Sequence, residues 1–164
     1  MEDFTNDQAT VRYAGFWLRF VAYIIDDMIM GVVGFLISIP FIGGIVFSAI
    51  GIGNNPDDTE NMVKGIAGIL GSVFGLMVVV VILGWLYFAL MESSKSQATL
   101  GKMALGLKVT DLEGNKVSFA RATGRYFGKI ISGMILYIGY ILAGLTEKKQ
   151  ALHDMMASCL VVRK

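Results

Sequence analysis

The chain has 164 residues, of which 55% are hydrophobic and 16% are charged, and its mean hydropathy is +0.65. A soluble domain carries about 25% charged residues, so the composition indicates a membrane protein. The net charge of +1 excludes a strongly basic nucleic-acid-binding chain, and the single cysteine excludes an intrachain disulfide.

The N-terminal stretch, residues 1–12, is acidic and polar, whereas a signal peptide begins with basic residues and an apolar run. It is predicted to be a short tail. The first apolar run predicts a transmembrane helix over residues 16–40, which Pro40 is expected to kink or end. A Gly-rich apolar run then extends the helix or lies in the far interface. Residues 54–61 contain Asn, Pro and Asp and predict an extracytoplasmic loop.

The second transmembrane helix is predicted over residues 63–91, and no charged residue occurs after Lys64 in this range. Ala67, Gly71 and Gly75 recur every four residues and therefore share one helix face. Small residues at this spacing let two helix backbones approach closely. The alternative is that glycine is simply common in membrane helices.

Residues 92–120 are more polar and predict a cytoplasmic segment. Apolar residues at helical spacing between Leu100 and Leu107 predict a short amphipathic helix lying in the membrane interface. The stretch "LKVTDLEGNKVSF" predicts a small β-hairpin around a Glu-Gly-Asn turn. The terminal "CLVVRK" could supply a third strand.

The third apolar region is predicted over residues 121–146, and residues 147–164 form a C-terminal segment. The region starts with a basic face made of Arg121, Arg125 and Lys129. Its apolar run, "IISGMILYIGYILAGL", is only just long enough to cross a bilayer. Two interpretations stay open: a straight crossing, or a re-entrant hairpin that returns to the side from which it entered.

Charge predicts the orientation of the helices. Basic residues outnumber acidic ones between positions 92 and 129, whereas the loop at 54–61 has acidic residues and no basic one. Positive loops stay cytoplasmic, so the N-terminus is predicted to be cytoplasmic. The C-terminal segment is also basic, which favours the re-entrant interpretation.

Three charges interrupt the first helix. Arg19 is expected at the interface, where its long side chain can reach water. Asp26 lies two turns deeper on the same face, where an aspartate costs about 2.5–3.5 kcal/mol on insertion scales. Asp26 and Asp27 are therefore candidates for an ion or proton site. The alternative for Asp26 is a buried ion pair that fixes helix registry.

No motif predicts an enzyme, a cofactor or a metal. "TLGKMALG" lacks the upstream glycine and the following Ser or Thr of a phosphate-binding loop, so nucleotide binding is not expected. His153, Asp154 and Cys159 offer too few ligands for a metal site.

Three ordered motifs, "AGFWLRFVAYIID", "KSQATLGKMALGLKVTD" and "QALHDMMASCLVV", resemble the RDD family of bacterial membrane proteins, named for one arginine and two aspartates. The resemblance covers roughly residues 13–163. It implies that Arg19, Asp26 and Asp154 are the family's three residues. With both ends of the chain cytoplasmic, an ion pair between Arg19 and Asp154 becomes possible.

The sequence therefore predicts an all-α membrane protein of the bacterial cytoplasmic membrane, with two long transmembrane helices, a third short apolar region, an interfacial helix and a small cytoplasmic hairpin. Family members are suspected transporters or membrane subunits. The resemblance thus implies a cation or proton transporter. Because two or three helices cannot enclose a pathway, transport would require an oligomer in which the intramembrane Asp26 of several subunits lines the route. The alternative is a non-catalytic subunit or adaptor that packs against other membrane proteins.

Overall fold

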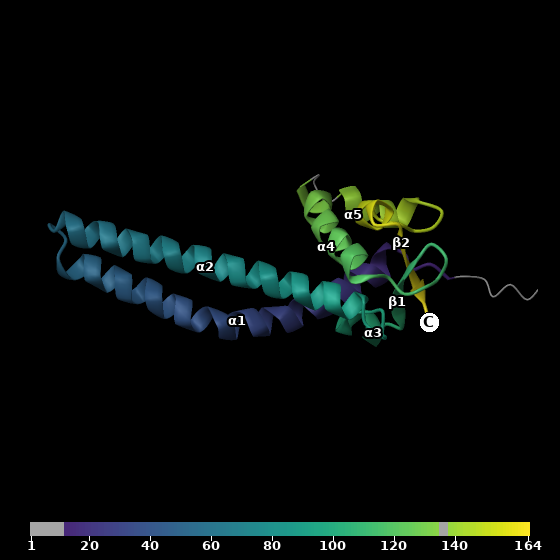
Figure 1. Cartoon of the computed structure of the whole chain (residues 1–164), viewed down its shortest axis with the longest axis horizontal. Helices are drawn as coiled ribbons and strands as arrows, with labels where there is room; N and C mark the ends of the chain where they lie inside the picture. Colours follow the sequence, from purple (N-terminus) through teal and green to yellow (C-terminus); the bar gives the residue numbers. More distant parts are fainter. Residues whose placement is uncertain (1–11, 135–137) are drawn as a thin grey trace, which may run out of the picture. The chain divides into compact units, whose positions relative to one another are not determined.

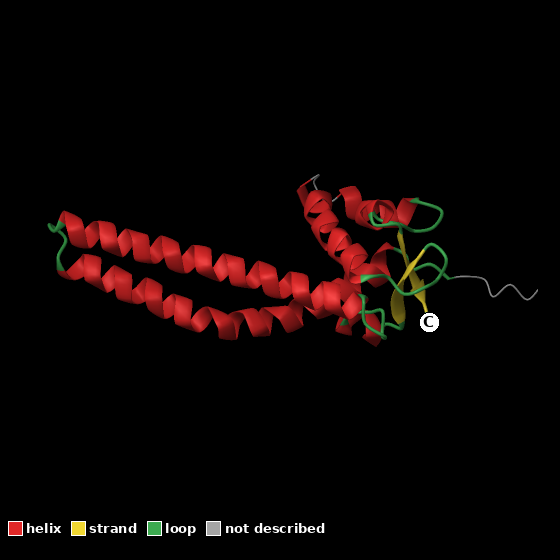
Figure 2. Cartoon of the chain, viewed as in Figure 1, coloured by secondary structure: helices red, strands yellow, loops and turns green. Residues whose placement is uncertain are grey.

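The computed structural model describes residues 12–134 and 138–164, and in these ranges the chain is mostly helical. Figure 2 shows the helices in red and the two strands in yellow. The elements, labelled in Figure 1, are α1 (Phe16–Asn54), α2 (Thr59–Glu92), α3 (Leu100–Ala104), β1 (Leu107–Asp111), α4 (Phe119–Met134), α5 (Ile138–Leu145), α6 (Leu152–Met156) and β2 (Cys159–Arg163). The predicted tail, residues 1–12, lies outside the described residues except for Arg12.

Two helices are long and apolar enough to span a membrane, as predicted. Helix α1 has 39 residues and continues through Pro40, so this proline does not end the helix, and the predicted alternative of a kink stays a prediction. A proline removes one N–H donor, and long membrane helices absorb that loss by local adjustment. The Gly-rich run after Pro40 extends the helix as far as Asn54.

Helix α2 has 34 residues and begins at Thr59, four residues before the predicted start. Asp58 explains the earlier start, because its Oδ1 accepts the N–H groups of Glu60 at 2.9 Å and Asn61 at 3.3 Å. A carboxylate in this position satisfies N–H groups that lack partners within the first turn. The predicted loop is thereby shortened to the residues between Asn54 and Thr59.

The chain divides into two compact units. One unit is Asp26–Tyr87, which contains most of α1 and α2. Small residues bring these helices together: a Cβ on Gly44 would lie 2.8 Å from Ser72 Oγ, and one on Gly75 would lie 3.0 Å from the Phe41 ring. Phe41 of α1 contacts Gly75 of α2, and the later residue Gly44 contacts the earlier residue Ser72, so the two helices are antiparallel (Figure 1).

Of the three small residues predicted to pack, only Gly75 faces α1. Ala67 and Gly71 are exposed, and nothing lies within 4 Å of a Cβ built on Gly71. Contacts between α1 and α2 instead use Gly68 and Ser72, on the neighbouring face. A packing role for Ala67 and Gly71 would need a helix from another molecule, and it stays a prediction.

The other unit combines Met1–Ile25 with Phe88–Lys164. Its sheet pairs β1 with β2 in antiparallel register, with Val109 opposite Val161, and both of these side chains are fully buried. The strand predicted from the C-terminal "CLVVRK" is thus the main partner of β1. Tyr13 extends the sheet through an isolated bridge to Val162.

The predicted hairpin turn is present, but its return strand is reduced to one bridge between Thr110 and Lys116. Asp111 Oδ1 accepts the N–H groups of Glu113 and Asn115, which closes the turn, and Gly114 has a φ of +88°. The return strand is short because α4 begins at Phe119. The sheet partner therefore comes from the end of the chain.

The interfacial helix corresponds to α3, which has only five residues and buries Lys102. The third apolar region forms α4 and α5, whose axes differ by 98°, so it is not one straight helix. Residues 135–137, between them, lie outside the described part. Gly139 packs against Ser132, since a Cβ there would lie 2.7 Å from Ser132 Cβ.

Candidate functional site

Six charged side chains meet inside the unit formed by the two ends of the chain. We call them the buried ion network: Arg19, Glu92, Lys102, Arg125, Lys129 and Asp154. They come from the start of α1, the end of α2, and helices α3, α4 and α6. One network therefore joins five helices that are distant in sequence.

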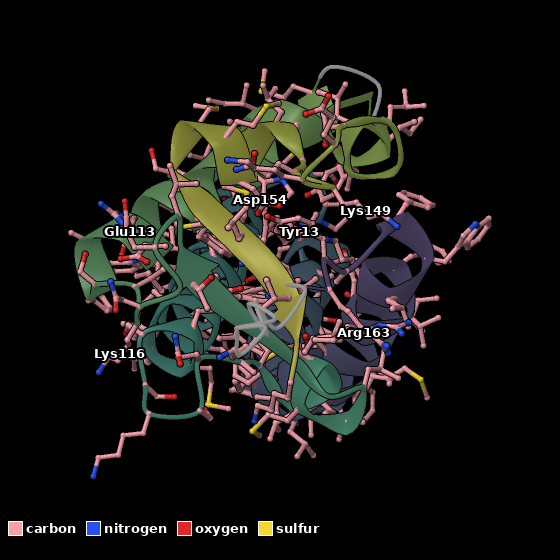
Figure 3. The ribbon with its side chains drawn as sticks, turned by 90° about the vertical axis from the view of Figure 1, so that its right-hand side faces the viewer. Tyr13, Glu113, Lys116, Lys149, Asp154 and Arg163 are labelled. Atoms are coloured by element: carbon pink, nitrogen blue, oxygen red, sulfur yellow. The ribbon has the colours of Figure 1, made fainter. Side chains whose placement is uncertain are left out.

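Asp154 is one of the two acidic centres of the network and is fully buried (Figure 3). Its Oδ1 accepts Arg125 Nε at 2.7 Å, and its Oδ2 accepts Arg19 Nη1. The same Oδ2 accepts the N–H of Ala151 at 3.1 Å, at the start of α6. Asp154 thus caps its own helix and binds two guanidinium groups.

The side chain of Arg19 donates hydrogen bonds to three different partners. Besides Asp154, it donates through Nε to Ala14 O at 2.8 Å and through Nη2 to Lys149 O at 2.6 Å. Its side chain is only 12% exposed. The structure therefore contains the predicted Arg19–Asp154 ion pair, and it shows that Arg19 is enclosed by protein rather than extended to water.

Glu92 is the second acidic centre and is 1% exposed. Lys102 Nζ donates to its Oε1 at 2.5 Å, and Arg125 Nη1 lies 2.7 Å from the same oxygen. Lys129 Nζ is more distant, at 3.9 Å, and also lies 4.0 Å from the centre of the Phe88 ring. Arg125 consequently bridges both carboxylates, because its Nε binds Asp154.

Burial would by itself raise the pKa of Asp154, but the guanidinium groups of Arg125 and Arg19 outweigh it and hold that pKa well below its usual range. His153 next to it is different. Burial lowers the pKa of His153 to about 3 despite the neighbouring Asp154, so the imidazole is neutral near pH 7. Its Nδ1 lies 3.3 Å from Ser132 Oγ, and its ring centre lies 5.1 Å from that of Tyr140, with the two ring planes tilted by 56°.

The charges within the network do not cancel. Four cations, Arg19, Lys102, Arg125 and Lys129, face two carboxylates, Glu92 and Asp154, which leaves a formal excess of two positive charges when every group is ionised. Burial lowers the pKa of Lys102, and Glu92 opposes that effect. Such a site holds its own carboxylates ionised and disfavours bound metal cations.

The first aspartate of the predicted site belongs to the other unit. Asp26 is 1% exposed, and the Tyr87 hydroxyl donates to its Oδ1 at 2.8 Å. Asp27, by contrast, is exposed on α1. Adjacent positions on a helix are rotated by about 100°, so only one of two neighbouring acids can face α2.

Sequence reasoning identified Arg19 and Asp154 but missed the rest of the network. Arg125 and Lys129 were interpreted as part of a basic face that sets topology, and Lys102 as part of an interfacial helix. One feature of the sequence points to a special position for Glu92: it is the first charged residue after the long uncharged run of the second helix. Spacing alone does not show which cation a buried glutamate binds.

No group of three or more His, Cys, Asp or Glu side chains that could hold a metal ion occurs in the described ranges. The chemistry available is therefore that of carboxylates, their cationic partners and a tyrosine hydroxyl. Asp26 accepts the Tyr87 hydroxyl, and the buried ion network holds several helix ends together.

Comparison with known proteins agrees with the motifs. The model of the RDD family matches residues 13–158. YxaI of Bacillus subtilis, described only as an uncharacterized protein, is 42% identical over 92% of this chain and 97% of its own length. YteJ of the same organism, described as an uncharacterized membrane protein, is 31% identical over 94% of this chain and 84% of its own length. No solved structure matches. Because the family model matches most of the chain, including the positions of Arg19, Asp26 and Asp154, this chain belongs to the RDD family.

Proposed function

We propose that this membrane protein acts as an oligomer in which Asp26 carries a proton or a cation across the bilayer. The observation that supports this most is the buried carboxyl group of Asp26, which accepts the Tyr87 hydroxyl between two apolar helices. An ionised aspartate at such a depth is costly, whereas a protonated one is cheap. A carboxyl group that binds a proton or a cation at this position would give Asp26 a role in transport.

The Tyr87 hydroxyl can form a hydrogen bond with Asp26 in either protonation state of the carboxyl group. It donates to the carboxylate when Asp26 is ionised, and the same oxygen can accept the carboxyl proton when Asp26 is neutral. Both protonation states then keep a partner.

Exposed residues support an oligomer. Asp27 is exposed on the mostly apolar helix α1, as is Gly31 one turn later. Nothing lies within 4 Å of a Cβ built on Gly31, so a second helix can approach there closely. Two helices alone do not enclose a pathway, and a second copy that covers Asp27 would place further acids beside the first.

The buried ion network supports a re-entrant third region. Arg125 precedes the apolar run and Asp154 follows it, yet Arg125 Nε and Asp154 Oδ1 are 2.7 Å apart. A straight crossing of about 16 residues would separate its two ends by about 24 Å. With the basic segments cytoplasmic, the network and both chain ends lie on the cytoplasmic side of the bacterial inner membrane.

Ion flux measured in proteoliposomes tests the proposal. Vesicles with an imposed proton or sodium gradient should dissipate it faster with the wild type than without protein. Asp26→Asn should return the flux to that of empty vesicles, and Asp57→Asn, in the loop between α1 and α2, should leave it unchanged. Wild-type vesicles that behave like empty ones under both gradients would contradict transport.

The alternative proposal, a non-catalytic subunit or adaptor, rests on a different observation. The buried ion network ties five helices into a fixed platform, and much of α1 and α2 presents large exposed apolar side chains. Such a molecule is suited to packing against other membrane proteins. Crosslinking from Asp27→Cys in native membranes separates the two: a transporter gives crosslinked copies of itself, whereas an adaptor gives a crosslink to another chain.

A further inference from the structure

A second site lies beside the start of α1, apart from Asp26. A cavity of about 470 Å³ opens there, between the first turn of α1, helix α5 and the end of β2. Its lining includes Phe16, Trp17, Ile141, Leu145, Lys149 and Arg163. We call it the basic cavity. Its walls are apolar, and its two charged residues are both cations.

The two cations are available for a ligand. Within residues 12–134 and 138–164, neither Lys149 nor Arg163 forms an ion pair, and no lining residue is acidic. Figure 3 shows both on the side of the view occupied by α1. A Cβ on Gly15 would lie 3.6 Å from Lys149 Nζ, so the ammonium group lies over the small residue that precedes the helix.

The backbone on both sides of the cavity is fixed. Lys149 has a φ of +48°, its N–H donates to Thr146 O at 3.0 Å, and its carbonyl accepts Arg19 Nη2 at 2.6 Å. Arg163 ends β2, and its N–H donates to Arg12 O at 2.9 Å. Both cations therefore extend from anchored positions, which lowers the entropy lost when a ligand binds.

The apolar walls decide what kind of anion fits. Trp17 is 73% exposed, Leu145 77% and Ile141 50%. Large exposed apolar groups at the end of a membrane helix belong at the boundary between headgroups and acyl chains. A soluble anion would contact only the two cations. A phospholipid would contact the cations through its phosphate and the apolar side chains through an acyl chain.

We propose that the basic cavity binds an anionic phospholipid, with its phosphate between Lys149 and Arg163 and an acyl chain along Trp17, Ile141 and Leu145. The contact from Lys149 O to Arg19 would connect the lipid to the Arg19–Asp154 pair. This site does not depend on transport through Asp26. Its partner is the membrane itself, selected by headgroup charge.

Quenching of Trp17 fluorescence tests this proposal directly. The chain has two tryptophans, so Trp85→Phe leaves Trp17 alone. The protein is placed in vesicles of phosphatidylcholine and phosphatidylglycerol, and bromine is carried by the acyl chains of one lipid or the other at equal mole fraction. Brominated phosphatidylglycerol should quench Trp17 more strongly, with an apparent preference on the order of tenfold.

The chain offers a control matched in charge. Lys149→Gln with Arg163→Gln should abolish the preference, whereas Lys148→Gln with Lys164→Gln removes the same charge from neighbouring positions outside the cavity and should keep it. Equal quenching by both lipids in the wild type would overturn the proposal, as would equal losses in the two double variants. Loss of the preference on adding millimolar inorganic phosphate would show a soluble-anion site and overturn it too.

A second measurement covers the case in which the cavity variant does not fold. Native mass spectrometry of the wild type in detergent should retain phosphatidylglycerol over phosphatidylcholine. Resistance of buried Cys159 to maleimide reports that each variant is folded. A folded wild type that retains both lipids equally contradicts the proposal without reference to any variant.

Discussion

Arg125 Nε lies 2.7 Å from Asp154 Oδ1, which joins α4, the first helix of the third apolar region, to α6, which follows that region. The same guanidinium reaches Glu92 at the end of α2 through Nη1. A single side chain thus links the end of a long apolar helix with the C-terminal segment. This makes Arg125, and not only the predicted Arg19, the centre of the network.

The Arg19–Asp154 pair should be strongly coupled. Asp154→Asn leaves Arg19 without its carboxylate partner and should lower the free energy of unfolding by about 3–5 kcal/mol. Arg19→Gln should cost less, because Asp154 keeps Arg125 as a cationic partner. The double variant should lose less than the sum, with a coupling of about 1–3 kcal/mol. Denaturation in detergent micelles measures all three.

Glu60→Gln provides the comparison, since Glu60 pairs with Lys64 on the exposed start of α2 and should change stability by at most about 0.5 kcal/mol. Strict additivity of the two network variants would contradict the coupling. Reversing both charges is not a useful test, because an arginine at position 154 would face Arg125.

Stability should depend on pH through His153. Burial lowers the folded-state pKa of His153 to about 3 from the ordinary histidine value of about 6.5. Between these two pH values the unfolded state binds a proton that the folded state does not. The part of the stability that depends on His153 is therefore fully present above about pH 6.5 and falls as the pH drops toward 3, by up to about 1.4 kcal/mol per pH unit. Melting temperatures between pH 7 and 4.5 measure this slope.

His153 is the only histidine in the chain. His153→Gln should therefore flatten the profile between pH 6.5 and 4.5, even if it lowers stability throughout. Below about pH 4.5 the carboxylates titrate as well. There, Asp154, with its lowered folded pKa, adds a loss as it becomes protonated. A wild-type melting temperature that stays constant from pH 7 to 5 would contradict the assignment.

The close packing of α4 on α6 depends on Gly128. A Cβ there would lie 3.1 Å from His153 Cβ and 3.3 Å from His153 Cα, and the backbone cannot yield without moving α6. Gly128→Ala should thus destabilise the protein by about 1–3 kcal/mol. Gly124, one turn earlier, has nothing within 4 Å, so Gly124→Ala should stabilise α4 by up to about 1 kcal/mol. Thermal unfolding of both variants should show opposite signs.

The sequence was sufficient for the long helices because hydropathy and length define them without tertiary information. It also predicted Arg19 with Asp154, since a family resemblance supplied the partner. The bounds were less well predicted. Pro40 did not end α1, and Asp58 started α2 early, because local hydrogen bonds, and not hydropathy, set a helix end.

The interior of the network could not be predicted for a physical reason. A charged face at helical spacing normally indicates a solvated surface, and Arg125 with Lys129 fits that pattern. Whether the face is buried depends on where Glu92 and Asp154 lie in space. Likewise, β1 has a nearby partner in sequence around Lys116, but β2 pairs with it more fully because α4 interrupts the local strand.

The proposed re-entrant topology of the third region predicts which segments share a side of the membrane. Single cysteines at Asp57, Glu113 and Lys148 are all at exposed positions. Glu113→Cys and Lys148→Cys should react with an impermeant maleimide from the same side, and Asp57→Cys from the opposite side. Native Cys159 should stay unlabelled in every variant, because burial encloses it and raises the pKa of its thiol to about 11. Labelling of position 148 together with position 57 would mean that the third region crosses the bilayer, and would contradict the topology drawn from the Arg125–Asp154 contact.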